Sequence, residues 1–497
     1  MNGRARAAFQ LWRARNARTA GGRAYVVYAV VMVMLVIVAP LARAIWVSAT
    51  SPAGIALLTS PIAPRATGFV VATLWAGALL LGRDRGPALL PPLLTHALAT
   101  SELPRSGAFG PPVLRAGLLV TAITALVATV IGGGLAHHGA TDLLGMAVFV
   151  AAGALVGVVT TIAWLAGQSL PRAAVPLALS LFGLGALTAV APGALPFVPW
   201  GWAGLAYPGG GPSPAVVLLA ACAAALVAAV PTLLNRLGLE ELSAQAARWD
   251  SAVTHATGLE LGAAAERYRM RPRLGRRIRA VRPVRPVTLR FLLRDAIGAI
   301  RTPGRLVVGV LTLGSAGALL VLALAPAAPA WLLGAGAGVL LFAGLGPLTD
   351  GIRHAVAVAS GTPLYGISDE RLLAGHALFP LAVVVIVLVA TVVVCSIAAG
   401  VPAAAAIVSA LAAGLLALAA RVGNALKGPL PPSLLAPIPT PMGDLGAAAR
   451  VVWALDGPML AAAAGAAAVL AFVHPLLLVG VVVAVAAVGI SRWRHRG

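Results

Sequence analysis

The stretch RYRMRPRLGRRIRAVRPVRPVTLRFLLRDAIGAIRTPGR, residues 267–305, decides how the chain is organised. It holds thirteen arginines against a single acid, Asp295, and it lies near the middle of the 497 residues, between two long apolar halves. A segment with this charge cannot cross the hydrocarbon core of a bilayer. The stretch therefore predicts that the middle of the chain stays on one side of a membrane.

The C-terminal part of this stretch predicts an amphipathic helix over 288–301. Its apolar side chains fall on one face: Leu289, Leu292, Leu293, Ala296, Ile297 and Ile300. Thr288 is the expected N-cap, and Pro303 followed by Gly304 ends the helix just before an apolar segment. An apolar face needs a partner, so we expect a helix in the membrane interface beside a span. The alternative is a solvated basic linker.

Composition places the chain among multi-pass membrane proteins, with the lipid bilayer as its main partner. Hydrophobic residues make up 60% of the sequence and charged residues 10%, with a mean hydropathy of +0.96. The net charge of +22 does not indicate nucleic-acid binding, because the basic residues lie in the connections between apolar segments. Cys222 and Cys395 lie inside apolar segments, which favours buried free thiols over a disulfide or a metal site.

The hydropathy pattern predicts an all-α polytopic fold with twelve transmembrane helices in two sets of six. The first set is expected near 25–45, 66–82, 113–135, 143–166, 173–193 and 214–234. The second set is expected near 304–325, 329–348, 376–399, 401–421, 456–473 and 475–492. The predicted domains are a first half over 1–234, a cytoplasmic linker over 235–287 and a second half over 288–497.

The positions of the basic residues predict that both termini are cytoplasmic. With twelve spans, 34 of the 36 Lys and Arg residues fall on one side or at its edge, and only Arg43 and Arg65 fall on the other. The richness in Ala, Arg, Gly and Pro is typical of high-GC bacterial genomes, so we expect a bacterial plasma membrane.

The two halves repeat one layout. A shift of 282 residues matches Phe9 with Phe291 and Leu11 with Leu293, and each half has its longer polar loop after its second span. Because six is an even number, both halves start on the same side and are expected to run parallel about a pseudo-two-fold axis.

No residues of the sequence form a recognisable catalytic, cofactor-binding or metal site, so we do not expect an enzyme. None of the predicted spans carries an Asp, Glu, Lys or Arg deep inside it, and no Walker A loop is present. His137 and His138 favour a polar turn over a metal site, because no further ligand lies nearby in the sequence. If the protein moves a substrate uphill, the energy must come from another chain.

An outer segment at 195–208, before the sixth span, is rich in proline and aromatic residues. Pro199, Trp200, Trp202 and Tyr207 suit either an aromatic belt at the membrane surface or a gate over an exit path. The prolines and glycines predict a short re-entrant or surface hairpin of helices.

This layout resembles the permease subunits of type-2 ABC exporters, over the whole chain as two fused six-span halves. The similarity rests on LLRDAIGAIRTPGR at 292–305, SELPRS at 101–106 and LPFVPWGW at 195–202. Two features depart from that family: most such permeases have six spans per chain, and the second half has no outer Pro-Trp-Gly segment.

The resemblance implies two cytoplasmic ATPase subunits, encoded separately, which bind ATP and magnesium and dock under the permease. The lead-in helices and the loops after each second span would couple to them. The residues expected there are Phe9, Leu11, Glu102, Leu103, Pro104, Arg290, Arg294, Asp295, Pro363, Leu364, Tyr365, Asp369 and Glu370. The predicted spans would line the substrate path without charged side chains. This suggests an amphipathic or hydrophobic cargo such as a lipid, a drug or another small molecule, or a peptide. An ATP-independent secondary carrier and a non-transporting membrane anchor subunit are the alternatives.

Overall fold

The fold consists of two compact units, and each is described here by itself. The computed structural model describes residues 10–12, 14, 24, 27–28, 30–32, 34–208, 214–268, 286–326, 328–359, 366–428, 430–434, 436, 439–440 and 443–495. Unit 1 covers Met1–Thr254 and unit 2 covers His255–Gly497. Their division falls inside the stretch 235–287, which the sequence predicts as a linker.

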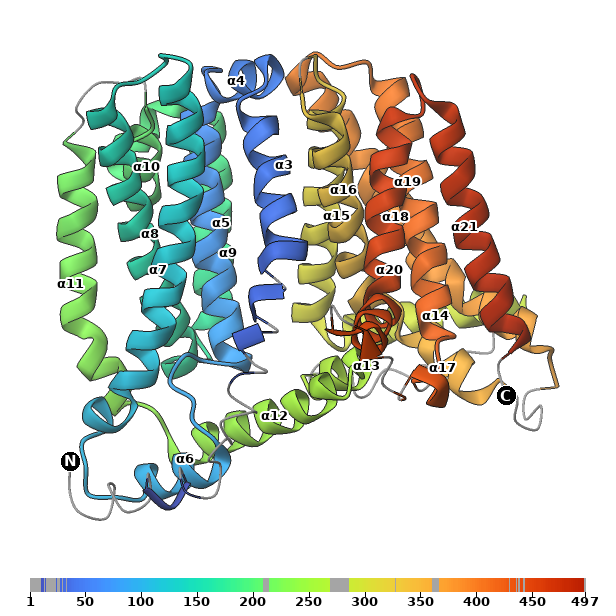
Figure 1. The fold of residues 1–497 in the computed structure, drawn as a ribbon, viewed down its shortest axis with the longest axis horizontal. Coiled ribbons are helices and arrows are strands. Elements are labelled where there is room, and N and C mark those ends of the chain that lie inside the picture. The colour runs from blue at the N-terminus through green and yellow to red at the C-terminus, as the bar shows by residue number, and fades with distance from the viewer. Residues whose placement is uncertain are drawn as a thin grey trace. The chain divides into compact units, whose positions relative to one another are not determined.

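Unit 1 is helical throughout its described residues. Its elements are η1 (Met34–Val38), α3 (Ala39–Ala49), α4 (Pro52–Leu58), α5 (Ala63–Asp84), α6 (Pro92–Ala99), α7 (Arg105–His137), α8 (Leu143–Ser169), α9 (Ala174–Val190), η2 (Pro192–Phe197), α10 (Pro199–Leu205), α11 (Ala215–Asn235) and α12 (Leu239–Thr257), which runs across the unit boundary. Helix α8 packs against α5, α7 and α11, and α5 also packs against α9 and α10 (Figure 1). The core between these helices includes Trp75, Val156 and Leu219.

Unit 2 is helical apart from one pair of two-residue strands. Its elements are α13 (Leu261–Glu266), α14 (Val287–Ile300), α15 (Pro303–Ala323), α16 (Ala330–Leu345), η3 (Gly346–Leu348), α17 (Asp350–Val358), α18 (Asp369–Ala399), α19 (Ala403–Ala425), η4 (Pro432–Leu434), β1 (Pro439–Thr440), β2 (Gly443–Asp444), α20 (Leu445–Leu470) and α21 (Pro475–Arg494). Helix α16 packs between α15 and α20, and α19 contacts α18, α20 and α21. A methyl group on Gly338 would overlap Ala461 of α20, so small residues allow this close approach.

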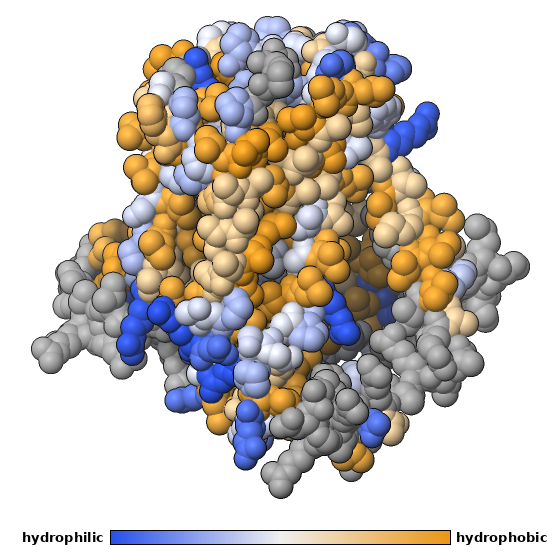
Figure 2. Space-filling model, turned by 90° about the vertical axis from the view of Figure 1, so that its left-hand side faces the viewer, coloured by the Kyte–Doolittle hydropathy of each residue, from blue (hydrophilic) through white to orange (hydrophobic). Residues whose placement is uncertain are grey.

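Ten described helices are long and apolar enough to cross a membrane, which makes this a multi-pass membrane protein. They are Ala63–Asp84, Arg105–His137, Leu143–Ser169, Ala215–Asn235, Pro303–Ala323, Ala330–Leu348, Asp369–Ile397, Ala403–Ala425, Ala448–Leu470 and Pro475–Arg494. Apolar side chains cover the middle of the face of unit 1 shown in Figure 2, and hydrophilic ones gather at its lower end. The span predicted at 173–193 is the shorter α9, and the one at 25–45 lies partly outside the described residues. The count of twelve stays a prediction.

Both units place a short helix and then a very long helix after their second predicted span. In unit 1 these are α6 and the 33-residue α7, and in unit 2 they are α17 and the 31-residue α18. At 1.5 Å per residue each long helix exceeds the roughly 30 Å of the hydrocarbon core by about ten residues. The first turns of α7 and α18 therefore have room to extend beyond the membrane, beside α6 and α17. We call the end of each unit where these turns lie its basic end.

The amphipathic helix predicted over 288–301 is α14, but its cap differs from the prediction. Pro286 precedes the first turn, so Thr288 lies within that turn rather than at the N-cap. The apolar face of α14 packs partly within unit 2, because Ala299 is buried and α14 packs against α18. Val287 and Ile300 remain exposed.

Candidate functional site

The first part of the candidate site joins the lead-in helix α14 to the start of α18. The Asp295 carboxylate Oδ2 lies 2.6 Å from Nδ1 of His376, whose side chain is fully buried. Next to this pair the ring centroids of Phe291 and His376 lie 4.8 Å apart, and a Cβ atom on Gly375 would come within 2.7 Å of Phe291. A tight contact and a hydrogen bond thus fix α14 against α18.

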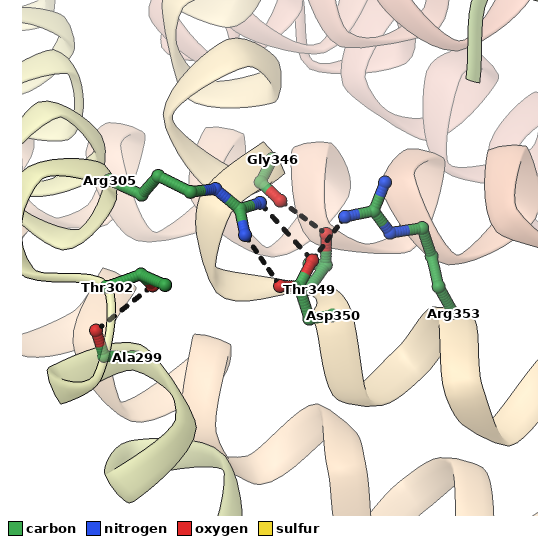
Figure 3. A network of polar contacts seen from close by, with 7 residues as sticks. All are labelled: Ala299, Thr302, Arg305, Gly346, Thr349, Asp350 and Arg353. Carbon is green, nitrogen blue, oxygen red and sulfur yellow. Dashed lines mark hydrogen bonds and ion pairs between the residues drawn. The ribbon is translucent and has the colours of Figure 1, made fainter. Parts of the chain in front are cut away.

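The second part joins α15 to α17 around one carboxylate. Arg305 and Arg353 approach Asp350 from opposite sides (Figure 3), and Arg305 donates two hydrogen bonds of 2.8 and 3.3 Å. Arg353 donates a third, to Oδ1. Burial opposes ionisation of Asp350, but the hydrogen bond and charge of Arg305, with the charge of Arg353, outweigh it and lower the pKa of this carboxyl group.

Arg421 of α19 adds a third guanidinium near this carboxylate. Its Cζ lies 4.4 Å from the centroid of the Phe342 ring, and a Cβ atom on Gly346 would come within 2.7 Å of its Nη2. The charge of Arg353 repels it and the charge of Asp350 attracts it. We call Arg305, Asp350, Arg353 and Arg421 the Asp350 cluster.

A separate group ties the C-terminal ends of α19 and α21 to α20. Lys427 donates to Asp456 Oδ1 at 2.7 Å and to the carbonyl oxygen of Trp453, and Arg492 pairs with Asp456 Oδ2. Arg492 also donates to the carbonyl oxygen of Gly423 at 3.0 Å. Burial lowers the pKa of Lys427, and the hydrogen bond to Asp456 only partly offsets it. We call Lys427, Asp456 and Arg492 the Asp456 cluster.

The basic end of unit 1 uses two glutamine side chains at the matching place, the turn after α5. Gln168 of α8 accepts a hydrogen bond from the Ala88 amide at 3.1 Å and donates one to Gln245 of α12 at 3.1 Å. Gln245 accepts from the Gly86 amide at 3.1 Å, and both glutamine side chains are buried. Arg85 adds a stack on Trp249, with 3.3 Å between Cζ and the ring centroid.

The coupling residues predicted in unit 1 lie in the connection from α6 to α7. Leu103 packs against the core that includes Phe109 and Leu237, and Pro104 precedes the first turn of α7, while Glu102 is exposed. The Ser106 amide donates to Asn235 Oδ1 at 3.4 Å, which holds this connection against the end of α11. Leu11, near the start of the chain, is exposed.

The structure brings some of the predicted coupling residues of unit 2 together and leaves others outside its description. Asp295 and Arg294 lie on α14 beside α17 and α18, and Arg290 lies one turn earlier. Asp369 and Glu370 form the first turn of α18. Phe9, Pro363, Leu364 and Tyr365 lie outside the described residues.

The outer segment forms the predicted pair of short helices, η2 and α10. Pro199 begins α10, and the buried Trp200 donates a hydrogen bond to Thr188 Oγ1 at 3.1 Å. Trp202 donates to the carbonyl oxygen of Pro196 at 2.7 Å. Tyr207 donates to the carbonyl oxygen of Leu58 at 2.8 Å, and burial raises its pKa to about 12. Trp200 and Tyr207 thus pack inside unit 1. Their role as a belt or a gate stays a prediction.

A cavity of about 360 Å³ lies beside this segment, between the α4–α5 connection, the end of α7 and α10. It is lined by Leu58, Thr59, Ser60, Pro61, Pro64, Leu135, Ala140, Gly204, Leu205, Tyr207 and Pro208. Its walls are mainly apolar, and its hydroxyl groups come from Thr59, Ser60 and Tyr207.

The partners in these clusters were missed by sequence reasoning, which assigned the basic residues at span ends to topology alone. Arg305 and Asp350 are 45 residues apart, and Asp295 and His376 are 81 apart. Asp456 lies inside the helix Ala448–Leu470, but it pairs with residues at the ends of α19 and α21 and is therefore near the basic end. Within the described ranges, no group of three or more His, Cys, Asp or Glu side chains could hold a metal ion.

Comparison with known proteins adds no relative. No protein-family model, curated protein or solved structure matches the chain.

Proposed function

We propose that this chain is the permease of an ATP-driven ABC exporter. The observation that supports this most is a pair of polar contacts between helices. Asp295 on α14 contacts His376 on α18, and Asp350 at the start of α17 forms an ion pair with Arg305 on α15. A displacement of α14 or of the α17 region would pass directly into α15 and α18, which are candidate membrane spans. Such a linkage is what a membrane subunit needs if a partner outside the membrane drives it.

The proposed topology has twelve spans, parallel halves and both termini in the cytoplasm of a bacterial cell. The ion pairs between described residues of unit 2 support a common cytoplasmic side. Those formed by Asp350, Asp295 and Asp456 all involve the ends of helices that meet at the basic end. Arginine-rich connections of this kind stay on the cytoplasmic side of bacterial membranes.

The proposed partners are two copies of a cytoplasmic ATPase that bind ATP and magnesium. The proposed cargo is amphipathic or hydrophobic, a lipid, a drug-like small molecule or a peptide. Support for the cargo class comes from the apolar walls of the candidate spans and from the charged clusters, which lie near helix ends rather than at mid-membrane. An ion-coupled carrier ordinarily keeps an ionisable group near the middle of the bilayer.

Affinity purification of the tagged chain in mild detergent, followed by an ATPase assay, tests this proposal. We expect a nucleotide-binding subunit to co-purify and to hydrolyse ATP at a rate that depends on the chain. The variant Asp295→Asn should lower that rate several-fold, because it removes the charge that pairs with His376. The matched control is Asp142→Asn, at the other end of unit 1, which keeps an N-cap for α8.

A chain that purifies alone and supports no ATP hydrolysis would contradict the proposal. The secondary carrier and the membrane anchor would then be separated by transport into vesicles driven by an ion gradient.

A further inference from the structure

The Asp350 cluster carries more positive charge than its carboxylate can balance. Both carboxylate oxygens of Asp350 accept hydrogen bonds from Arg305 and Arg353, and the guanidinium group of Arg421 lies near enough to interact with Asp350 electrostatically. The nearby acid Asp295 is engaged by His376. Guanidinium groups do not lose their protons in proteins, so the charge excess cannot be relieved by titration.

The cluster also holds hydrogen-bond donors that have no acceptor among the described residues. Nε of Arg353 is buried without a partner among the described residues, and the Arg421 guanidinium lies over the ring of Phe342. Nε2 of the adjacent His354 is likewise buried and unpartnered. Burying polar groups without partners is costly, which indicates that an acceptor belongs here.

The Asp456 cluster provides a comparison within the same unit. It combines two cations with one carboxylate, one cation fewer than the Asp350 cluster, and Lys427 and Arg492 direct further donors to the carbonyl oxygens of Trp453 and Gly423. Carbonyl groups thus complete that cluster internally. In the Asp350 cluster no described residue accepts from Arg353 Nε. Both clusters carry a positive charge, so they differ in how their hydrogen bonds are satisfied.

The Asp350 cluster lies at the level where lipid headgroups are found. Arg305 is the third residue of α15, Gly346 directly follows α16, and Arg421 lies in the last turns of α19. All three helices are candidate membrane spans. Basic pockets between membrane helices at this level are typical sites for anionic lipid headgroups.

We propose that Arg353 and Arg421 bind a phosphate group, supplied by the headgroup of an anionic phospholipid. The phosphate oxygens would accept from Arg353 Nε and from the Arg421 guanidinium, while Arg305 remains with Asp350. Arginine suits this role because its planar group can donate two parallel hydrogen bonds to a phosphate. The bound headgroup would link α17 to α19, two helices that the proposed transport mechanism does not connect by an ion pair.

Lipid titration of the delipidated full-length chain in detergent tests the site. Phosphatidylglycerol, phosphatidylcholine and sodium phosphate are each added, and binding is measured by native mass spectrometry and by the shift in unfolding temperature. Wild type should bind phosphatidylglycerol in preference to phosphatidylcholine. The variant Arg421→Gln should weaken this binding about fivefold to tenfold. The control Arg115→Gln removes an exposed arginine of α7 and should leave it unchanged.

A second variant protects the test against a folding defect. In Gly346→Ala the new methyl group would lie 2.7 Å from Arg421 Nη2, which displaces the guanidinium tip while keeping its charge. It should also weaken phosphatidylglycerol binding. Equal stabilisation by sodium phosphate would support the phosphate site and assign it to a soluble phosphate. Equal binding of both lipids, or unchanged binding in Arg421→Gln and Gly346→Ala, would overturn the proposal.

Discussion

The basic ends of the two units hold equivalent helices with different chemistry. In unit 1 the turn after α5 is fixed by the amides of Gln168 and Gln245, whereas in unit 2 the turn after α16 is fixed by Asp350 and its arginines. Both arrangements hold polar groups that packing removes from water. The amides carry no charge, although Gln245 also donates to Glu241 at 3.3 Å, so this arrangement should depend less on salt and pH than the ion pairs do. The repeated layout therefore does not make the two halves interchangeable.

The largest expected effect comes from removing the carboxylate of Asp350 in unit 2. The change Asp350→Asn leaves Arg305 and Arg353 without their counter-ion, and we expect unit 2 to lose about 2–4 kcal/mol of stability. Hydrogen exchange should rise in peptides of α15 and α17 and stay unchanged in unit 1. Glu102→Gln, which alters an exposed acid of unit 1, is the control. Equal exchange in both variants would mean that the ion pairs do not stabilise unit 2.

The contact between α14 and α18 can be broken sterically. A methyl group on Gly351 would overlap both the Asp295 carboxylate and the His376 ring, so Gly351→Ala should cost about 1–3 kcal/mol and loosen α14. The control Gly298→Ala places its methyl in open space on α14 and should be neutral or stabilising. Proteolysis near the start of α14 measures the difference. Equal protection of both variants would show that Asp295 and His376 do not hold this helix.

In unit 1 the corresponding change is Gln245→Ala. It leaves the Gly86 amide and one side of Gln168 without partners, and we expect a loss of about 1–3 kcal/mol. The comparison becomes sharp when unfolding is repeated at high salt. The effect of Gln245→Ala should change little with salt, whereas that of Asp350→Asn should shrink. A parallel salt response would remove the distinction between the two ends.

The smallest expected effect is the pH dependence of unit 2. Because the folded-state pKa of Asp350 is lowered, its stabilising contribution is present above the ordinary Asp value of about 3.9 and is lost as pH falls through the lower folded value. The unfolding temperature should therefore decline in acid, and Asp350→Asn should lack that part of the decline. An identical acid profile in the variant would contradict the assignment.

The sequence predicted the helices well because each depends on local information. Runs of apolar residues located ten of the membrane helices, and the period of apolar side chains located α14 within one residue at either end. The helices α6 and α17 also fall in the connections after the second spans, as the repeated layout indicated.

The contents of the site could not be read in the same way. Asp295 was singled out, but its partner His376 is distant in sequence, and a histidine inside an apolar run gives no sign of what it faces. Arg421 and Arg492 looked like topology signals, since arginine at a span end is common whether or not it is paired. Gln168 and Gln245 carry no charge and no motif, so only the packing of α12 against the turn after α5 reveals them.

The most direct measurement is hydrogen exchange of the chain, purified with the proposed ATPase partner, with and without ATP and magnesium. The proposed mechanism predicts that nucleotide changes the protection of α14, α17 and the first turns of α18, because polar contacts join these elements to the spans. Unchanged exchange in these helices, in a complex that hydrolyses ATP, would contradict the claim that a conformational change of the ATPase is transmitted to unit 2.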